Sequence, residues 1–190
     1  MRRTFIAAGV VVLGVAGLPG AAQAGSDDGK VWVTRADQLR YQAADGKQSR
    51  VVITRSGRTV TVDDRVAVKA GKGCKPVKGD RTKVRCTLKK TPSKITVTLG
   101  DRNDSLVNKS DLKLHVYGGT GKDSITGGPR SDFIQGDSGN DKLYGKGGAD
   151  SLYAGTGNDM VSGGDGDDWL HGGAGEDQLL GEGGKDTVAG

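Results

Sequence analysis

The chain has 190 residues, of which 34 are glycine and only 34% are hydrophobic, and its formal net charge is +5. It contains two histidines and neither an HExxH nor a GxSxG sequence, so it lacks the motifs of zinc proteases and of serine hydrolases. One short apolar run stands near the N-terminus and no second hydrophobic segment follows, which excludes repeated membrane spans.

Residues 1–24 have the pattern of a secretory signal peptide. Arg2 and Arg3 precede the apolar run, and the small-residue sequence AQA ends at Ala24, where we expect cleavage. The run is too short for a stable membrane span, and no cysteine follows it as a lipid anchor. We therefore expect a secreted, extracellular protein without a membrane span.

Residues 25–117 predict an irregular β region. Its alternating segments are Val51–Thr54 and Thr59–Val62, which form a hairpin across Ser56-Gly57, followed by Val84–Leu88 and Ile95–Leu99. We expect this region to continue into the following part of the chain and to cap its open end.

The only two cysteines, Cys74 and Cys86, are separated by 11 residues, a length suited to a strand-loop-strand hairpin. An exported protein with an even cysteine count favours a disulfide, which would stabilise by about 3 kcal/mol in the chain-entropy account. Free thiols and metal ligands are the alternatives, but no CxxC or Cys-His spacing supports them.

Charge is divided between the two parts of the chain. Residues 25–117 carry a net charge of +11, whereas residues 118–190 carry −8. Lys69, Lys72, Lys75 and Lys78 surround the cysteine segment. Two interpretations stay open: a solvated basic face, which we favour, or a binding surface for anionic cell-wall polymer or nucleic acid.

Eight nine-residue units run without interruption from Gly118 to Ala189. Position six is always aspartate: Asp123, Asp132, Asp141, Asp150, Asp159, Asp168, Asp177 and Asp186. Position eight is always aliphatic: Ile125, Ile134, Leu143, Leu152, Val161, Leu170, Leu179 and Val188. A fixed period of this kind indicates a solenoid.

These units resemble the GGxGxDxUx nonapeptide of the RTX family, the hemolysin-type calcium-binding repeat. The resemblance implies a parallel β-roll in which each calcium ion lies between successive coils, held by two aspartates and by turn carbonyls. The wider layout is similar to small exported actinobacterial calcium-binding proteins, through Ala70–Cys74, Val84–Cys86 and Ile95–Asp104. That second resemblance implies no activity beyond calcium binding.

The fold class that we predict is therefore all-β: a calcium-binding roll at 118–190, preceded by an irregular β region with one disulfide. Each unit is expected to supply a six-residue turn and a three-residue strand, so two units make one 18-residue coil. Alternate aspartates then line opposite edges, and a hard cation with oxygen ligands relieves their repulsion. Four turns on each edge leave three gaps, giving at most about six Ca²⁺ ions.

Two departures and one lead-in modify this pattern. Pro129 and Arg130 disturb the second unit, which makes the gap between Asp132 and Asp150 the weakest candidate. Leu99 is followed by GDRNDSLVN, which mimics a unit with one residue missing.

A flexible acidic tail is the alternative to an ordered roll, and it describes the state that we expect without calcium.

Outward positions seven and nine carry four aromatic residues, which we interpret as packing in preference to a sugar or protein contact strip: Phe133, Tyr144, Tyr153 and Trp169. Both histidines, His115 and His171, are also predicted to face outward.

The function predicted is a non-enzymatic, calcium-binding structural or adhesive protein with no small-molecule substrate. Specific binding of anionic surface polymer by the basic region is the alternative. The last coil is expected to expose strand edges, which permits self-association.

Overall fold

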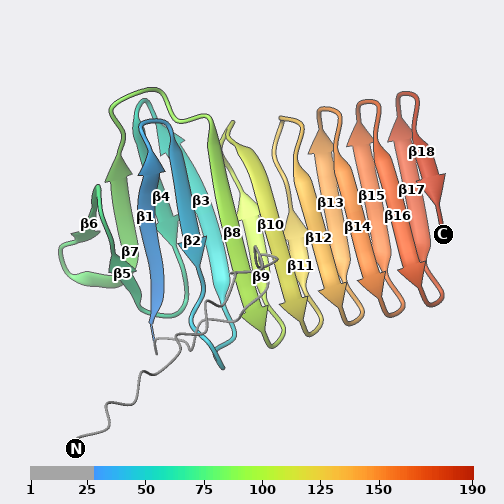
Figure 1. Cartoon of the computed structure of the whole chain (residues 1–190), viewed down its shortest axis with the longest axis horizontal. Helices are drawn as coiled ribbons and strands as arrows, with labels where there is room; N and C mark the ends of the chain where they lie inside the picture. Colours follow the sequence, from blue (N-terminus) through green and yellow to red (C-terminus); the bar gives the residue numbers. More distant parts are fainter. Residues whose placement is uncertain (1–27) are drawn as a thin grey trace, which may run out of the picture.

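The structure is a computed structural model that describes residues 28–190, and it consists of two long β-sheets packed face to face (Figure 1). The signal peptide predicted at 1–24 lies outside the described residues. Over residues 28–190 the chain forms strands and no helix, so none of the described segments is a helix that could cross a membrane. The predicted all-β class is confirmed.

Each sheet has nine strands. Sheet A has the order β18-β16-β14-β12-β10-β8-β2-β1-β5, and sheet B has the order β17-β15-β13-β11-β9-β3-β4-β7-β6. The strands of sheet A are β1 (Gly29–Arg35), β2 (Gln38–Gln42), β5 (Val68–Ala70), β8 (Lys94–Asp101), β10 (Lys113–Thr120), β12 (Phe133–Ser138), β14 (Ser151–Thr156), β16 (Trp169–Ala174) and β18 (Thr187–Ala189). The strands of sheet B are β3 (Arg50–Ser56), β4 (Thr59–Asp63), β6 (Cys74–Val77), β7 (Asp80–Thr87), β9 (Ser105–Asn108), β11 (Ser124–Thr126), β13 (Lys142–Gly147), β15 (Met160–Asp165) and β17 (Gln178–Gly183).

From β8 onward the chain alternates between the sheets and winds into a parallel solenoid of about five turns. We call its repeat coils, residues 118–190, the roll. In the roll each paired residue lies opposite the residue 18 positions later, as Ile134 does Leu152 and Leu152 does Leu170. The predicted coil of two units is therefore confirmed. The coil before the roll is one residue longer, because Ile95 pairs with Leu114. Position-eight side chains form the core between the sheets and are fully buried from Ile125 to Leu170.

The expected three-residue strand is wrong for the central coils, where each strand has six residues, as in β12 and β14. The strand continues through positions one to three after the xUx triplet, because Asp137 and Ser138 pair with Gly155 and Thr156 of the next coil. The turn is correspondingly short. Backbone reversal is concentrated at positions two and four, where φ is positive, as at Gly155 (115°) and Gly157 (140°).

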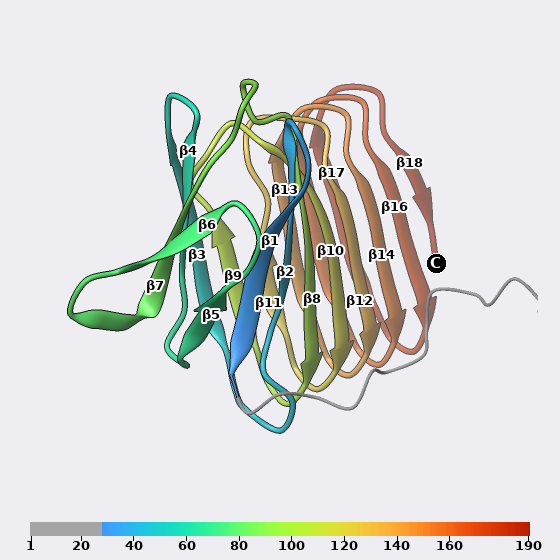
Figure 2. The same cartoon turned by 60° about the vertical axis from the view of Figure 1, so that its left-hand side comes forward.

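Strands β1 to β7 form a cap built largely from antiparallel pairs. The predicted hairpin is present as β3 and β4, although its loop is Gly57-Arg58, one residue later than expected, since Ser56 pairs with Thr59. Strand β2 pairs in parallel with β8, and β3 with β9. Both sheets and the core thus run without a break from the cap into the roll (Figure 2).

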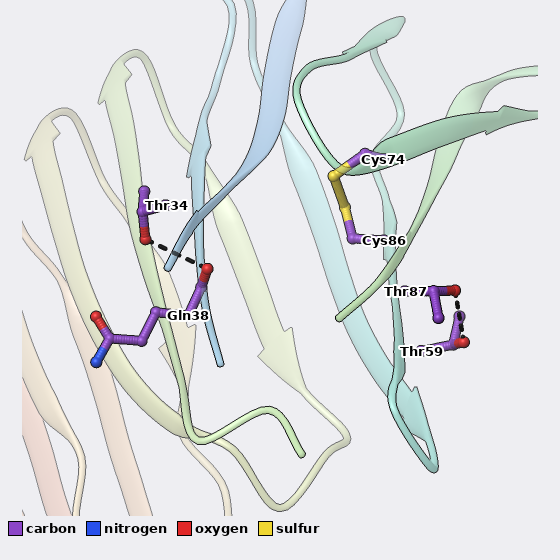
Figure 3. The surroundings of a disulfide bond; sticks show 6 residues. All are labelled: Thr34, Gln38, Thr59, Cys74, Cys86 and Thr87. Atoms are coloured by element: carbon purple, nitrogen blue, oxygen red, sulfur yellow. Dashed lines mark hydrogen bonds between the residues drawn. A yellow bond between two sulfur atoms is a disulfide. The ribbon is translucent and has the colours of Figure 1, made fainter. Parts of the chain in front are cut away.

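The predicted disulfide joins Cys74 and Cys86, which lie opposite each other on β6 and β7 with Cα atoms 4.0 Å apart (Figure 3). Cys86 is buried in the core, and Cys74 packs at its margin. The hydroxyls of Thr59 and Thr87 are hydrogen-bonded at 2.9 Å beside the bridge. The cross-link therefore fastens β6, the outermost strand of sheet B, to its neighbour β7.

Candidate metal sites between the coils

The position-six aspartates stand in two columns, one along each edge of the roll. Within a column, Oδ1 of each aspartate accepts a hydrogen bond from the backbone N–H of the aspartate one coil earlier. Asp123 N donates to Asp141 at 2.8 Å, and Asp132 N donates to Asp150 at 2.7 Å. The columns are Asp123, Asp141, Asp159 and Asp177 on one edge, and Asp132, Asp150, Asp168 and Asp186 on the other.

The second carboxylate oxygen of most column members has no partner. Oδ2 accepts no hydrogen bond in Asp123, Asp141, Asp150, Asp159 and Asp168, and these residues are only 1–3% exposed. A buried carboxylate oxygen without a donor is costly, and native structures seldom leave one unexplained. A cation between the coils would remove this cost.

The raised pKa values of the column aspartates also indicate that their carboxylates lack a compensating positive charge. Burial raises the pKa of Asp123, Asp132 and Asp141 to about 6 and that of Asp150 to about 7, against a usual value near 4. Burial also raises the pKa of Asp159. The backbone donors at Oδ1 oppose this rise and do not cancel it. Without a cation, these buried carboxyls therefore hold their protons more strongly than exposed ones do.

Backbone carbonyls supply further oxygens in the gaps. A Cβ on Gly118 would lie 2.6 Å from Oδ2 of Asp123 and 2.6 Å from the carbonyl oxygen of Gly136, one coil later. The two oxygens thus approach the same point. At position four, a Cβ on Gly139 would overlap the carbonyl oxygen of Gly121. Glycine at these positions lets carboxylate and carbonyl oxygens crowd into each gap.

This donor set fits calcium. Calcium takes six to eight oxygens from carboxylates, carbonyls and water, whereas zinc prefers cysteine and histidine. Across residues 28–190 no three or more His, Cys, Asp or Glu side chains form a group suited to a metal. Any ion in a gap must therefore combine a few carboxylates with backbone carbonyls. The role of the eight aspartates as ligands stays a prediction, and the structure gives them the placement that it requires.

The second unit differs in the way its sequence suggests. Oδ2 of Asp132 accepts a hydrogen bond from Gly128 N at 2.7 Å, so this oxygen is already satisfied. Gly128 occupies position two, yet its φ is not among the positive values found for other position-two residues. Pro129, with its fixed φ, follows directly. A competing donor therefore acts at Asp132, and the gap between Asp132 and Asp150 stays the weakest candidate.

The last coil is more open than the others. Asp177 and Asp186 are half-buried, and Val188, whose counterparts form the core, is 51% exposed. These two aspartates have a neighbour on one side only within the described chain.

Two buried aspartates upstream of the repeats were missed, and one of them, Asp104, belongs to a column. Asp104 N donates to Oδ1 of Asp123 at 2.8 Å, which places Asp104 in the first column. The expectation that its unit lacks a residue is wrong, because Gly100 pairs with Gly119 and Leu99 therefore fills position one. Beyond it, Asp64 accepts a 2.6 Å hydrogen bond from the Tyr41 hydroxyl. The motif GDRND was the available signal for Asp104.

Two of the four outward aromatic residues, Phe133 and Tyr153, pack into a ladder on sheet A, as expected. Ring centroids are 5.2 Å apart for His115 and Phe133, 5.5 Å for Phe133 and Tyr153, and 6.2 Å for Tyr153 and His171. On sheet B, the Tyr144 hydroxyl contacts Met160 Sδ at 3.8 Å. Trp169 is 48% exposed. Both histidines thus serve in the ladder and face away from the core.

The four lysines around the cysteine segment are exposed at the far end of the cap. Lys69 forms an ion pair with Asp28 at 3.3 Å. Lys75 and Lys78, together with Arg85, line an open hollow of about 890 Å³ beside the disulfide. The basic charge is therefore gathered at the end of the molecule opposite the roll.

Comparison with protein families identifies the repeats. Residues 117–152 and 153–188 each match the RTX calcium-binding nonapeptide repeat, in four copies. Comparisons with curated proteins and with solved structures gave no match. The family match agrees with the eight units counted in the sequence and covers the roll without the cap.

Proposed function

We propose that the RTX calcium-binding nonapeptide repeats of residues 117–188 make this chain an extracellular structural or adhesive protein whose roll folds as it binds calcium. The fold and the repeats already characterise a calcium-binding β-roll protein. The unpaired, buried Oδ2 atoms of the aspartate columns carry the proposal, because they need a cation that the chain itself does not provide.

Each proposed ion lies in a gap between successive coils, in the first column or the second. Two aspartates and neighbouring turn carbonyls hold it, as with Asp141, Asp159 and the carbonyl of Gly139. The ion supplies positive charge to a roll that carries −8 and permits its buried carboxylates to stay ionised. Up to about six gaps between the eight repeat aspartates are available.

Metal binding and folding are coupled in this proposal. Each unit buries one aliphatic side chain, so hydrophobic burial alone offsets little of the ordering cost of nine residues. The free energy of calcium binding then supplies what the core lacks.

Far-ultraviolet circular dichroism during a calcium titration tests the proposal. We expect β-structure to increase from chelator to millimolar calcium, and magnesium to substitute poorly because it requires a tight octahedron. Asp150→Asn should shift the titration to higher calcium. Asp165→Asn, which removes the same charge from an exposed position three, should not. An unchanged spectrum between chelator and calcium would contradict the proposal.

A second candidate function is retention on an anionic surface polymer through the cap. The observation that favours it is the hollow lined by Lys75, Lys78 and Arg85. Replacing the four lysines (Lys69, Lys72, Lys75 and Lys78) with glutamate should reduce retention on purified cell wall. Lys142→Glu with Lys185→Glu on the roll is the control. Equal retention of all three proteins would leave the basic surface a solvated face.

A further inference from the structure

The turn that ends at Asp104 lies at the junction between the cap and the roll, upstream of the residues that match the repeat family. Strand β9 follows this turn and pairs with β11, with Ser105 opposite Ser124 and Leu106 opposite Ile125. The turn therefore stacks directly on the turn that ends at Asp123. A gap between coils exists here that the eight repeats do not include.

Asp104 presents its carboxylate to this gap in the same way as the column members. Oδ1 accepts a 2.7 Å hydrogen bond from Ser49 N, and Oδ2 is buried without a partner. The whole residue is only 3% exposed. An oxygen in this condition marks a ligand position, because its desolvation is otherwise uncompensated.

Backbone carbonyl oxygens lie at this gap as they do at the gaps of the roll. A Cβ on Gly121 would overlap the carbonyl oxygen of Arg102, as one on Gly139 would overlap that of Gly121. Arg102 has φ of 84°, the left-handed conformation that glycine adopts at position four elsewhere. Although its residue types differ, this turn thus offers the gap the same kinds of oxygen.

Asp64, a buried aspartate of the cap, differs from Asp104 because the protein satisfies both of its carboxylate oxygens. Asp64 is buried, and its Oδ2 accepts a hydrogen bond from the Tyr41 hydroxyl at 2.6 Å. Its Oδ1 accepts hydrogen bonds from Arg50 N and Arg65 N, each at 2.6 Å. Both oxygens are satisfied by the protein, so the series of unpaired oxygens begins at Asp104.

We propose that Asp104 and Asp123, with the carbonyl oxygen of Arg102, hold one further calcium ion at the junction of cap and roll. This inference rests on the proposed function. The first column then contains five aspartates and four gaps, against three gaps in the second. The turn between β8 and β9 supplies one wall of the additional site, and Ser49 N of the preceding cap holds Asp104 in place. This ion therefore joins the first repeat coil to the coil that rests on the cap.

Calcium stoichiometry by native mass spectrometry and isothermal titration tests the additional site. Asp104→Asn retains an acceptor for Ser49 N but replaces the unpaired oxygen with an amide, so it should bind one ion fewer than the wild type. The control is Asp101→Asn in the same turn, where the carboxylate accepts from Gly46 N at 2.6 Å. The control should bind the wild-type number of ions.

Equal stoichiometry for Asp104→Asn and the wild type would overturn the junction site while leaving calcium binding by the roll intact. A wild-type protein that binds no calcium would instead contradict the proposed function itself. Should Asp104→Asn fail to fold, terbium bound to wild-type crystals decides the question. An anomalous peak between Asp104 and Asp123 supports the site, and its absence, with peaks in other gaps, refutes it.

Discussion

The cap and the roll share two continuous sheets but satisfy their buried groups differently. The cap encloses Tyr41 and Asp64 as a closed hydrogen-bonded pair, is cross-linked by a disulfide, and has a dense aliphatic core. The roll buries one aliphatic side chain per unit and leaves carboxylate oxygens unpaired. We therefore expect the stability of the roll, but not that of the cap, to depend on calcium.

Removal of calcium is expected to have the largest effect and to act on one region. In chelator, backbone amides of the roll strands such as β13 to β16 should lose protection from hydrogen exchange, while those of β3, β4 and β7 keep theirs. Hydrogen exchange with mass spectrometry resolves the two regions. Simultaneous loss of protection in both would show that they form one cooperative unit.

Loss of the disulfide should act on the opposite region. Cys74→Ser with Cys86→Ser removes a constraint on the unfolded cap, and we expect a destabilisation of about 3 kcal/mol. Thermal unfolding measures the loss of stability, and amide hydrogen exchange in β3 and β4 assigns it to the cap. The calcium concentration at the midpoint of the roll's folding should stay constant. Two free thiols in the secreted, non-reduced wild type would contradict the bridge.

Substitutions in the two columns should have effects graded by the position of the aspartate along its column. Asp159 has a neighbour on both sides, whereas Asp186 has one, so Asp159→Asn should weaken two sites and Asp186→Asn one. Isothermal titration should then show a loss of up to two tight sites against one. Equal losses would be inconsistent with ions held between neighbouring coils.

A smaller effect should follow from pH in the absence of calcium. The folded pKa values of Asp123, Asp141 and Asp150 are raised to about 6 or 7, so the folded roll binds protons more strongly than the unfolded chain. Its stability should accordingly fall as pH rises from about 4 to about 7. Circular dichroism in chelator should show more β-structure at pH 5 than at pH 8, a difference that calcium abolishes. A pH-independent spectrum would argue against buried carboxyls.

Local pattern was sufficient to predict much of this fold. The nine-residue period fixed the two aspartate columns and the core positions, because each depends only on spacing along the chain. The hairpin of β3 and β4 was predicted from alternating apolar and polar residues. The disulfide was predicted from the even cysteine count and the expected export of the protein. Strand length was mispredicted because glycine was assigned to turns, whereas Gly136 lies within β12, where its missing side chain admits a carboxylate oxygen.

What could not be predicted depends on distant contacts. Tyr41 and Asp64 meet only after two hairpins have packed, and Ser49 reaches Asp104 across 55 residues. Asp104 was hidden because Leu99 replaces the glycine that marks position one. The competing donor at Asp132 depends on the backbone angle of Gly128, which single residue types do not specify.

Each 18-residue coil contains two nine-residue units, and these two units contribute their strands to different sheets. The rings of Phe133, Tyr153 and His171 recur on sheet A because they lie 18 or 20 residues apart. Deleting two units would shorten the roll by one coil and keep every later strand in its sheet. Deleting one unit would preserve the aspartate and aliphatic periods yet transfer every later strand to the opposite face, and Tyr153 would lose Phe133 as a neighbour. The roll is therefore modular in steps of 18 residues, although its sequence repeats in steps of nine.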